Sequence, residues 1–127
     1  MVDGKCFYIN SDLDKPANSY HDYERLCKEK GARIASIETD QEANFLKSEL
    51  PQGIEWVWLG AVRQEGPNFL WADDGSIVQN VYTDQNLPEG LACLNWKKKV
   101  IENSWAWVYY GVPCIGFDQP NTWICEK

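Results

Sequence analysis

The hydrophobic pattern of this chain centres on one segment, Ile54–Ala61, in which Glu55 is the only charged residue. Successive side chains of a strand point to opposite faces, so this segment would present apolar residues on both sides of a strand. One face would carry Trp56, Trp58 and Gly60, and the other Val57, Leu59 and Ala61. A strand that is apolar on both faces must be covered on both, so we expect it in the middle of a sheet.

Two segments with helical spacing precede this strand. The first starts with a capping pattern at Ser19 and stops at Gly31, whose freedom to take positive φ suits the end of a helix. Its apolar stripe, which directs Cys27 toward the core, consists of Tyr20, Tyr23, Leu26 and Cys27. The second runs from the capping box Thr39–Glu42 to Pro51, which ends it. Its inward-facing residues are Ala43, Leu46 and Leu50.

The chain after Ala61 contains only short strand-like runs separated by turns. From Ser76 to Ala92 the periodicity is lost, and long irregular loops of this kind usually carry function. Regular alternation returns in three short strands that we expect in one antiparallel sheet, Cys93–Trp96, Ser104–Trp107 and Thr122–Cys125. The basic run Lys97–Lys99 between them is interpreted as a solvated turn. With a first strand at Lys5–Ile9, then helices and then strands, the pattern predicts an α+β domain.

Length and charge narrow the possible classes of protein. A chain of 127 residues is enough for one domain with a real core, so residues 1–127 are expected to form a single unit. The net charge of −7 argues against binding to nucleic acid or to anionic membrane surfaces, which select basic faces. No stretch approaches the about 20 apolar residues of a membrane helix. Residues 1–4 show no signal-peptide pattern, so any leader is expected to have been removed.

The five cysteines indicate the compartment. They are Cys6, Cys27, Cys93, Cys114 and Cys125. No Cys-x-x-Cys pair is present and His21 is the only histidine, so structural disulfides are a better interpretation than a zinc or redox site. Disulfides indicate a secreted or extracellular protein. No nucleophile with a matching base, no phosphate-binding glycine loop and no paired carboxylates are apparent, so an enzyme is not expected.

Taken in order, these landmarks resemble the C-type lectin-like domain, and the resemblance runs from Cys6 to Glu126. Single motifs are weak, but their combined order and spacing are specific. The motifs that carry the resemblance are the helix ending in Cys27, Gly31–Ile37, Asn44–Leu46, Trp58–Ala61, Phe69-x-Trp71 with Asp74–Ser76, Cys93-Leu94, Cys114, and Trp123–Glu126. The resemblance implies two helices and a mixed, mainly antiparallel sheet with a long irregular loop, stabilised by disulfides.

The resemblance also implies two bridges, Cys27–Cys125 and Cys93–Cys114, which spacing alone could not select. Cys6 is then left over. An odd cysteine suggests an intermolecular bond, and hence a disulfide-linked dimer, or a partner in a missing segment. The alternative is a small buried residue in the first strand.

Calcium-dependent members of this family hold Ca²⁺ with a Glu-Pro-Asn in the long loop and a Trp-Asn-Asp in a later strand. This sequence departs from both motifs. Pro88 is flanked by Leu87 and Glu89, and either Trp105-Ala106-Trp107 or Trp107-Val108-Tyr109 stands at the second motif. Because Ca²⁺ needs about six to eight oxygen ligands, we expect no ion at the usual sugar site. The acidic residues that could hold Ca²⁺ at an auxiliary site are Asp73, Asp74, Asp84 and Glu89.

The remaining features predict a non-catalytic recognition module that binds a protein or a glycan. Aromatic side chains near the long loop suit such contacts, although Trp105 and Trp107 could instead be buried. The expected ligand-binding residues are Tyr82, Asp84, Asn86, Glu89, Trp96, Trp105, Trp107 and Tyr109. The alternative is a calcium-dependent carbohydrate-binding lectin with a divergent site, and the effect of EDTA on ligand binding separates the two.

Overall fold

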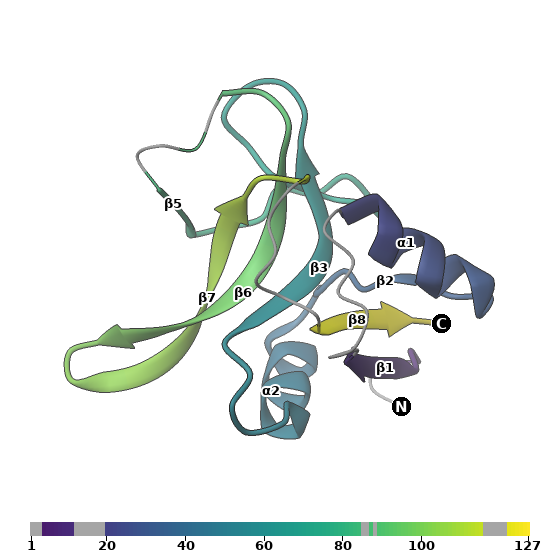
Figure 1. The fold of residues 1–127 in the computed structure, drawn as a ribbon, viewed down its shortest axis with the longest axis horizontal. Helices are drawn as coiled ribbons and strands as arrows, with labels where there is room; N and C mark the ends of the chain where they lie inside the picture. The colour runs from purple at the N-terminus through teal and green to yellow at the C-terminus, as the bar shows by residue number, and fades with distance from the viewer. Residues whose placement is uncertain (1–3, 12–19, 85–86, 88, 116–121) are drawn as a thin grey trace.

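The computed structural model describes residues 4–11, 20–84, 87, 89–115 and 122–127. Within these ranges the chain forms helices and strands that build an α+β fold, as predicted (Figure 1). The helices are α1 (Tyr20–Glu29) and α2 (Asp40–Glu49). The strands are β1 (Phe7–Ser11), β2 (Arg33–Ile34), β3 (Trp56–Arg63), β4 (Leu70–Trp71), β5 (Val81–Thr83), β6 (Ala92–Ile101), β7 (Ser104–Val112) and β8 (Thr122–Glu126).

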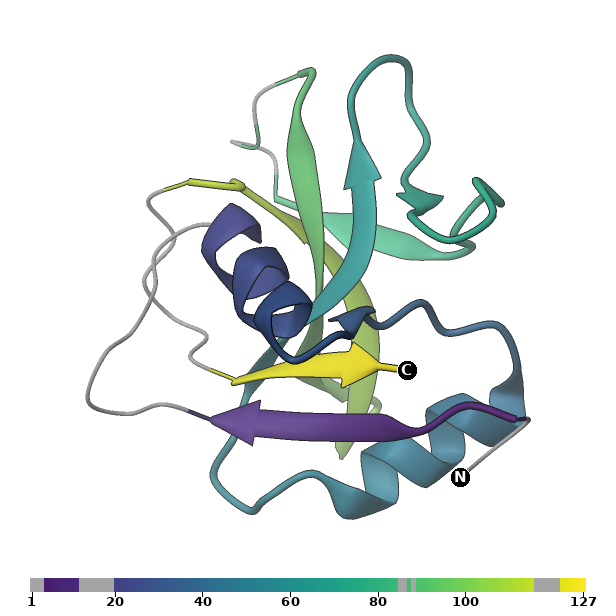
Figure 2. The ribbon, with the colours of Figure 1, turned by 90° about the vertical axis from the view of Figure 1, so that its right-hand side faces the viewer.

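The sheet is mixed and has β3 near its centre. Its order is β1-β8-β3-β6-β7-β5, while β2 also pairs with β8 and β4 with β3. The pairs β3–β8 and β5–β7 are parallel, and the other pairs are antiparallel. Strands β1 and β8 lie side by side, so segments near the two ends of the chain meet in the sheet (Figure 2). The predicted central position of the Trp56–Ala61 run is confirmed.

The two faces of β3 support two different parts of the core. Val57, Leu59 and Ala61 belong to one buried cluster, to which α2 contributes Ala43 and Leu46. Trp58 belongs to the other, together with residues of α1 and β8 that include Tyr20, Tyr23, Cys27 and Trp123. The ring of Tyr23 lies 5.5 Å from that of Trp58 and 4.9 Å from that of Trp123, between centroids. Each helix therefore covers one face of the central strand.

The ends of the helices follow local signals. The Thr39 hydroxyl accepts a hydrogen bond from the Glu42 backbone N–H at 3.1 Å, as its capping position predicts. The Glu42 carboxylate accepts from the backbone N–H of Glu38 at 3.1 Å. At the end of α1, Gly31 has φ +70°, a conformation that favours glycine. The expected cap at Ser19 lies outside the described residues.

The structure corrects the interpretation of Lys97–Lys99 as a turn, because all three residues lie inside β6. Strands β6 and β7 form one long hairpin that closes at Glu102 (φ 50°) and Asn103 (φ 67°), as in two-residue hairpin turns. Three consecutive lysines are accommodated in this strand because their side chains lie over aromatic rings. The ammonium of Lys97, for example, lies 4.8 Å from the ring of Trp56.

Both disulfides expected from the family resemblance are present. Cys27–Cys125 joins α1 to β8 across 98 positions, and Cys93–Cys114 closes the base of the β6–β7 hairpin across 21 positions. Cys6 is unpaired and partly buried. Its backbone N–H and C=O pair with those of Lys127, at 3.1 and 2.9 Å, which extends the pairing of β1 with β8. Among the described residues, no helix is long and apolar enough to cross a membrane.

Candidate ligand-binding site

Described residues of the segment predicted as a long irregular loop, namely residues 77–81, Thr83, Glu89 and Gly90, form one wall of a cleft of about 820 Å³. The short strand β5 lies in this segment and pairs in parallel with Tyr109–Gly111 of β7. Arg63 spans one side of the cleft, since its Nε donates to the Gly90 carbonyl at 2.9 Å and its guanidinium lies 5.3 Å from the ring of Phe69. A smaller hollow of about 400 Å³, lined by Trp71, Asp74 and Tyr109, also borders residues 77–80. The sequence had not singled out Arg63 or Phe69 as site residues.

The predicted loop residues are exposed where they are described. Tyr82 projects from β5 and has the Lys99 ammonium 4.5 Å from its ring centroid. Asp84 follows β5, and Glu89 lines the larger cleft. Burial, together with the carboxylate of Asp84, raises the pKa of the Tyr110 hydroxyl, so these two groups lie close together. Asn86 lies outside the described residues.

The aromatic residues of the hairpin divide between surface and core. Trp105 is 61% exposed, which settles that residue in favour of the surface, and Trp107 is half-buried. Tyr109 is half-buried with its ring 5.7 Å from that of Trp71, and burial raises its pKa to about 12.

Trp96 does not belong to an exposed edge, which corrects the prediction. It is 1% exposed and packs in the core with its ring stacked on Tyr109 at 6.2 Å. The reason is that this part of β6 is covered on both faces, because all residues from Ala92 to Trp96 are buried. Lys47 of α2 covers Trp96 further, with its ammonium 5.4 Å from the ring.

The expected sugar-site motifs lack most of the family's oxygen ligands, although Glu89 remains. Leu87 is half-buried against the core, and it lies so close to β7 that a Cβ added at Gly111 would be 3.2 Å from its Cδ2 atom. The same added Cβ would be 2.7 Å from Phe69 Cζ, so glycine is needed there. On β7, the positions around Val108 and Tyr109 offer no side-chain carboxylate or amide oxygen.

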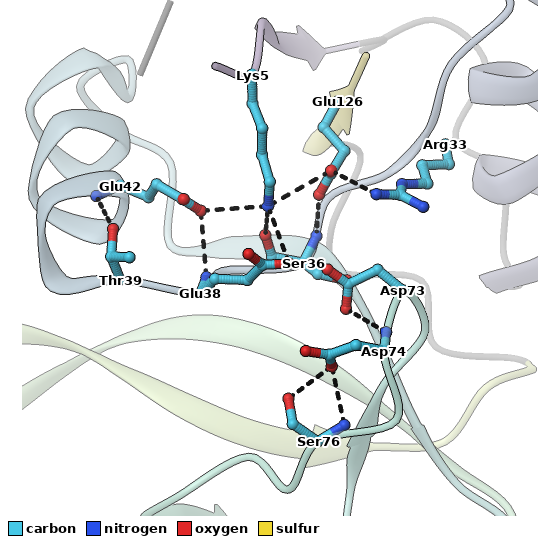
Figure 3. Close-up of polar contacts among 10 residues, drawn as sticks. All are labelled: Lys5, Arg33, Ser36, Glu38, Thr39, Glu42, Asp73, Asp74, Ser76 and Glu126. Atoms are coloured by element: carbon cyan, nitrogen blue, oxygen red, sulfur yellow. Dashed lines mark hydrogen bonds and ion pairs between the residues drawn. The ribbon is translucent and has the colours of Figure 1, made fainter. Parts of the chain in front are cut away.

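The predicted auxiliary acidic cluster is assembled differently. Asp73 and Asp74 lie with Glu38, and one carboxylate oxygen from each falls within 4.8 Å of the others (Figure 3). In the described part of the chain, Asp84 and Glu89 do not join this group. A hydrogen bond to Asp73 is the main cause that raises the pKa of Glu38. Burial acts to raise the pKa of Asp73, but hydrogen bonds from Glu38 and from the Asp74 N–H outweigh it and lower that pKa.

A partly buried cation lies beside these acids. The ammonium of Lys5 is 3.4 Å from Glu42 Oε1, 3.4 Å from Glu38 Oε1 and 3.5 Å from Glu126 Oε2 (Figure 3). It also donates to the carbonyl of Ser36 at 3.2 Å. Burial acts to lower the pKa of Lys5, but the attraction of the three carboxylates outweighs it and raises that pKa. Sequence patterns gave no signal for this cluster, because its members are distant in the chain.

Comparisons with known proteins support the same fold. Residues 16–127 match the family described as Lectin C-type domain. One chain of the snaclec coagulation factor IX/factor X-binding protein of Protobothrops flavoviridis is 29% identical over 118 residues, which cover 85% of this chain and 70% of that relative. C-type lectin domain family 12 member B of Mus musculus is 28% identical over 133 residues, covering 96% of this chain but 41% of the relative. The chain spans 29% of another relative, C-type lectin domain family 2 member D6 of Rattus norvegicus.

Two solved structures show the likeness in three dimensions. The C-type lectin domain of murine dendritic cell inhibitory receptor 2, in complex with N-glycan, has a TM-score of 0.70 at 18% identity and covers 97% of this chain and 90% of that one. The Ca²⁺-independent C-type lectin SPL-2 from Saxidomus purpuratus has a TM-score of 0.70 at 19% identity, covering 98% and 86%. Sequence motifs, disulfides, sheet topology and a family match over most of its length agree: the chain belongs to the C-type lectin domain family.

Proposed function

We propose that this domain is an extracellular, non-catalytic recognition module that binds a protein or a glycan without a calcium ion at the family's usual sugar site. The ligand surface consists of the loop residues Tyr82, Asp84, Asn86 and Glu89 and the β7 residues Trp105, Trp107 and Tyr109. Binding there depends on aromatic contact and on polar loop groups rather than on chelation.

The observation that carries this proposal is the chemistry of β7 and the loop beside it. Ca²⁺ is bound by oxygen ligands, and several must converge on one ion. Leu87 instead packs toward the core, and neither Val108 nor Tyr109 supplies a carboxylate or amide oxygen. Trp105 meanwhile is 61% exposed, which suits a ligand contact better than a structural role.

Relatives of this family bind varied ligands, which fits a recognition module. One relative is named for binding coagulation factors IX and X, and one structural neighbour was solved with N-glycan. Structural neighbours include both a Ca²⁺-dependent antifreeze protein and a Ca²⁺-independent lectin. The fold therefore supports recognition with and without the ion, and the residues of this chain favour the latter.

A glycan array and a panel of immobilised extracellular proteins, each probed with calcium and with EDTA, test the proposal. We expect a ligand whose binding is the same in both buffers. Tyr82→Ala and Trp105→Ala should each weaken that binding by about 2 kcal/mol. Tyr8→Ala is the matched control, because Tyr8 is an exposed aromatic residue on β1, at the other end of the sheet.

The alternative function is a calcium-dependent lectin with a divergent site. Asp84 and Glu89 are exposed in the loop and are the acids that such a site would use. If calorimetry detects tight calcium binding that Glu89→Gln abolishes together with sugar binding, the calcium-free proposal is wrong.

The state of the Cys6 thiol is a separate question. Its partial burial in the pairing of β1 with β8 suits the interpretation as a packed residue, whereas an intermolecular bond would require its side chain to be reached from outside. Non-reducing electrophoresis with thiol titration distinguishes a monomer with one free sulfhydryl from a covalent dimer with none.

A further inference from the structure

The outer edge of β7 is paired along only part of its length. β6 pairs with β7 from Ser104 to Val112, but on the other side β5 pairs only with Tyr109–Gly111. Among the described strands, none pairs with the outer edge of β7 between Ser104 and Val108. This part of the hairpin projects away from the helices (Figure 1). An open strand edge is a template for another strand.

The register shows which backbone groups face the open edge. The N–H of Lys98 donates to the carbonyl of Glu55 at 2.9 Å, so the backbone of Lys98 faces β3 and not β7. Lys98 is opposite Trp107, which makes them a pair without mutual backbone hydrogen bonds. The N–H and C=O of Trp107 therefore point away from β6, and those of Trp105, two residues earlier, do the same. These groups are available to an added strand.

The side chains around this edge form an exposed apolar surface. Val100 lies opposite Trp105 in the hairpin, and the two are 52% and 61% exposed. The ammonium of Lys98 lies 5.9 Å from the ring of Trp105 and 6.0 Å from that of Trp107, so its side chain crosses over β7 toward the edge. An apolar residue of an incoming strand would pack against Trp105.

Positive charge gathers on both faces of this hairpin, although the chain as a whole carries −7: Lys98 shares the face of Trp105 and Trp107, and Lys97 and Lys99 lie on the other face. Within the described residues, none of Lys97, Lys98 and Lys99 forms an ion pair; each lies over aromatic rings instead. The ammonium of Lys99 lies over the ring of Tyr82 on β5. An added strand would lie beside β7 in line with β5, so this ammonium is already close to the place where that strand would bind. Two copies joined edge to edge would bring six lysines together, which disfavours a second copy as occupant.

We infer that the open edge of β7 at Trp105–Trp107 binds an extended acidic segment of a protein ligand as an added strand. Backbone groups of Trp105 and Trp107 bind its backbone, Trp105 packs on its apolar residues, and Lys99, on the opposite face of the hairpin, attracts its carboxylates. The inference rests on the proposed function in that β7 belongs to the ligand surface, and it specifies the class of ligand.

The test uses the whole disulfide-bonded chain and a capped heptapeptide of alternating aspartate and valine. Nuclear magnetic resonance should show saturable shifts of the backbone amides of Trp105 and Trp107, with slowed hydrogen exchange at both. A peptide with lysine in place of aspartate should not produce them. Lys99→Glu should weaken binding by about tenfold or more, because the aspartates lie on the Lys99 face when valine packs on Trp105, and their attraction to Lys99 becomes a repulsion.

A matched pair of variants isolates the backbone contact. Trp105→Ala and Trp105→Pro both remove the ring, but only the proline variant also lacks the outward N–H. An edge strand tolerates proline at such a position. We expect the proline variant to bind about fivefold more weakly than the alanine variant. Unchanged amide spectra outside the hairpin confirm that both variants are folded. Equal affinities of the two would contradict strand addition.

Other outcomes separate this inference from the proposed function. No saturable shift up to about 2 mM peptide overturns the inference. If a sulfated heparin tetrasaccharide shifts the lysines while the peptide does not, the surface binds polyanions and the inference is likewise wrong. Calcium-independent binding of a glycan that is lost in Tyr82→Ala would support the proposed function, whether or not the peptide binds. Peptide binding that EDTA abolishes would contradict the proposed function but not the strand contact.

Discussion

Replacing Lys5 by methionine tests whether the partly buried ammonium stabilises the fold. Methionine keeps most of the length and apolar character of the side chain while removing its charge. In the native protein the ammonium faces three carboxylates and the Ser36 carbonyl, all between 3.2 and 3.5 Å away. Lys5 belongs to the N-terminal segment, whereas Ser36 and Glu38 precede α2, Glu42 lies in its first turn and Glu126 ends β8. The substitution therefore removes a contact that joins three separate parts of the chain.

The expected cost is about 3 kcal/mol in the free energy of unfolding. Removing one partner of a buried ion pair costs about 3–5 kcal/mol, because the other charge remains buried. The side chains of Glu42 and Glu126 are 1% and 2% exposed, so solvent can compensate them little, whereas those of Lys5 and Glu38 are 15% and 39% exposed. The low end of the range applies because both carboxylates keep other hydrogen bonds. Glu42 still accepts one from the Glu38 N–H, and Glu126 still accepts from the Ser36 N–H at 2.6 Å and from Arg33 at 3.1 Å.

Urea unfolding followed by tryptophan fluorescence under non-reducing conditions measures this cost. For a domain of this size the same loss should lower Tm by roughly 10 °C. Lys30→Met is the matched control, since Lys30 is exposed and its ammonium contacts only the Asn10 side chain among the contacts described, and it should change stability by less than about 0.5 kcal/mol. Adding Glu42→Gln to Lys5→Met should cost less than the sum of the single changes.

The pH dependence gives a second check. The carboxylates raise the folded-state pKa of Lys5 above 10.5. The native state thus holds this proton more tightly than the unfolded chain does. The stabilisation that the Lys5 charge gives the fold is therefore complete below about pH 10, and it is lost as pH rises through the folded-state pKa. A cost below about 1 kcal/mol at neutral pH, with an unchanged urea dependence, would refute the reasoning, as would additive effects of Lys5→Met and Glu42→Gln.

Three further predictions concern the rest of the fold. Gly60→Ala should lower stability by about 2 kcal/mol or more in urea unfolding, because the added Cβ would lie 2.6 Å from the Ile34 carbonyl oxygen; a neutral effect would show that this approach is not tight. Burial raises the pKa of Tyr109 from 10.0 to about 12, so the unfolded chain loses this proton first and stability should fall between those pH values, less steeply in Tyr109→Phe if the tyrosine is responsible. Replacing Cys93 and Cys114 by serine should lower the free energy of unfolding by about 3 kcal/mol, while peptide maps still show the Cys27–Cys125 bridge. Loss of the Cys27–Cys125 bridge in this variant would indicate wider misfolding.

The features that could be predicted from the sequence are those with a local or periodic signal. The two-residue period of β3 predicted its central place, and Thr39 and Gly31 marked helix ends through their own backbone chemistry. The disulfide pairing is different, because it came from the family resemblance and not from spacing. Both bridges were confirmed by the structure.

The errors arose where a side chain's role depends on its neighbours in space. Lys97–Lys99 looked like a turn because three consecutive charges are unusual in a strand, and only the rings beneath them explain their position. Trp96 was grouped with the other aromatic residues near the ligand edge, but both faces of β6 are covered from Ala92 to Trp96. The Lys5 cluster had no pattern at all, since Glu126 lies at the far end of the chain from Lys5.

The two ends of the β6–β7 hairpin differ in a way that separates stability from recognition. At its base, the Cys93–Cys114 bridge and the tight packing of Phe69 on Gly111 fix the strands to the core. At its tip, Trp105 is exposed and makes little contact with the core, so changing it should cost little stability. Substitutions at the tip should therefore alter ligand binding without loss of fold, whereas substitutions at the base should lower both together. The rigid base also holds the tip in one position, which reduces the entropy lost when a ligand binds there.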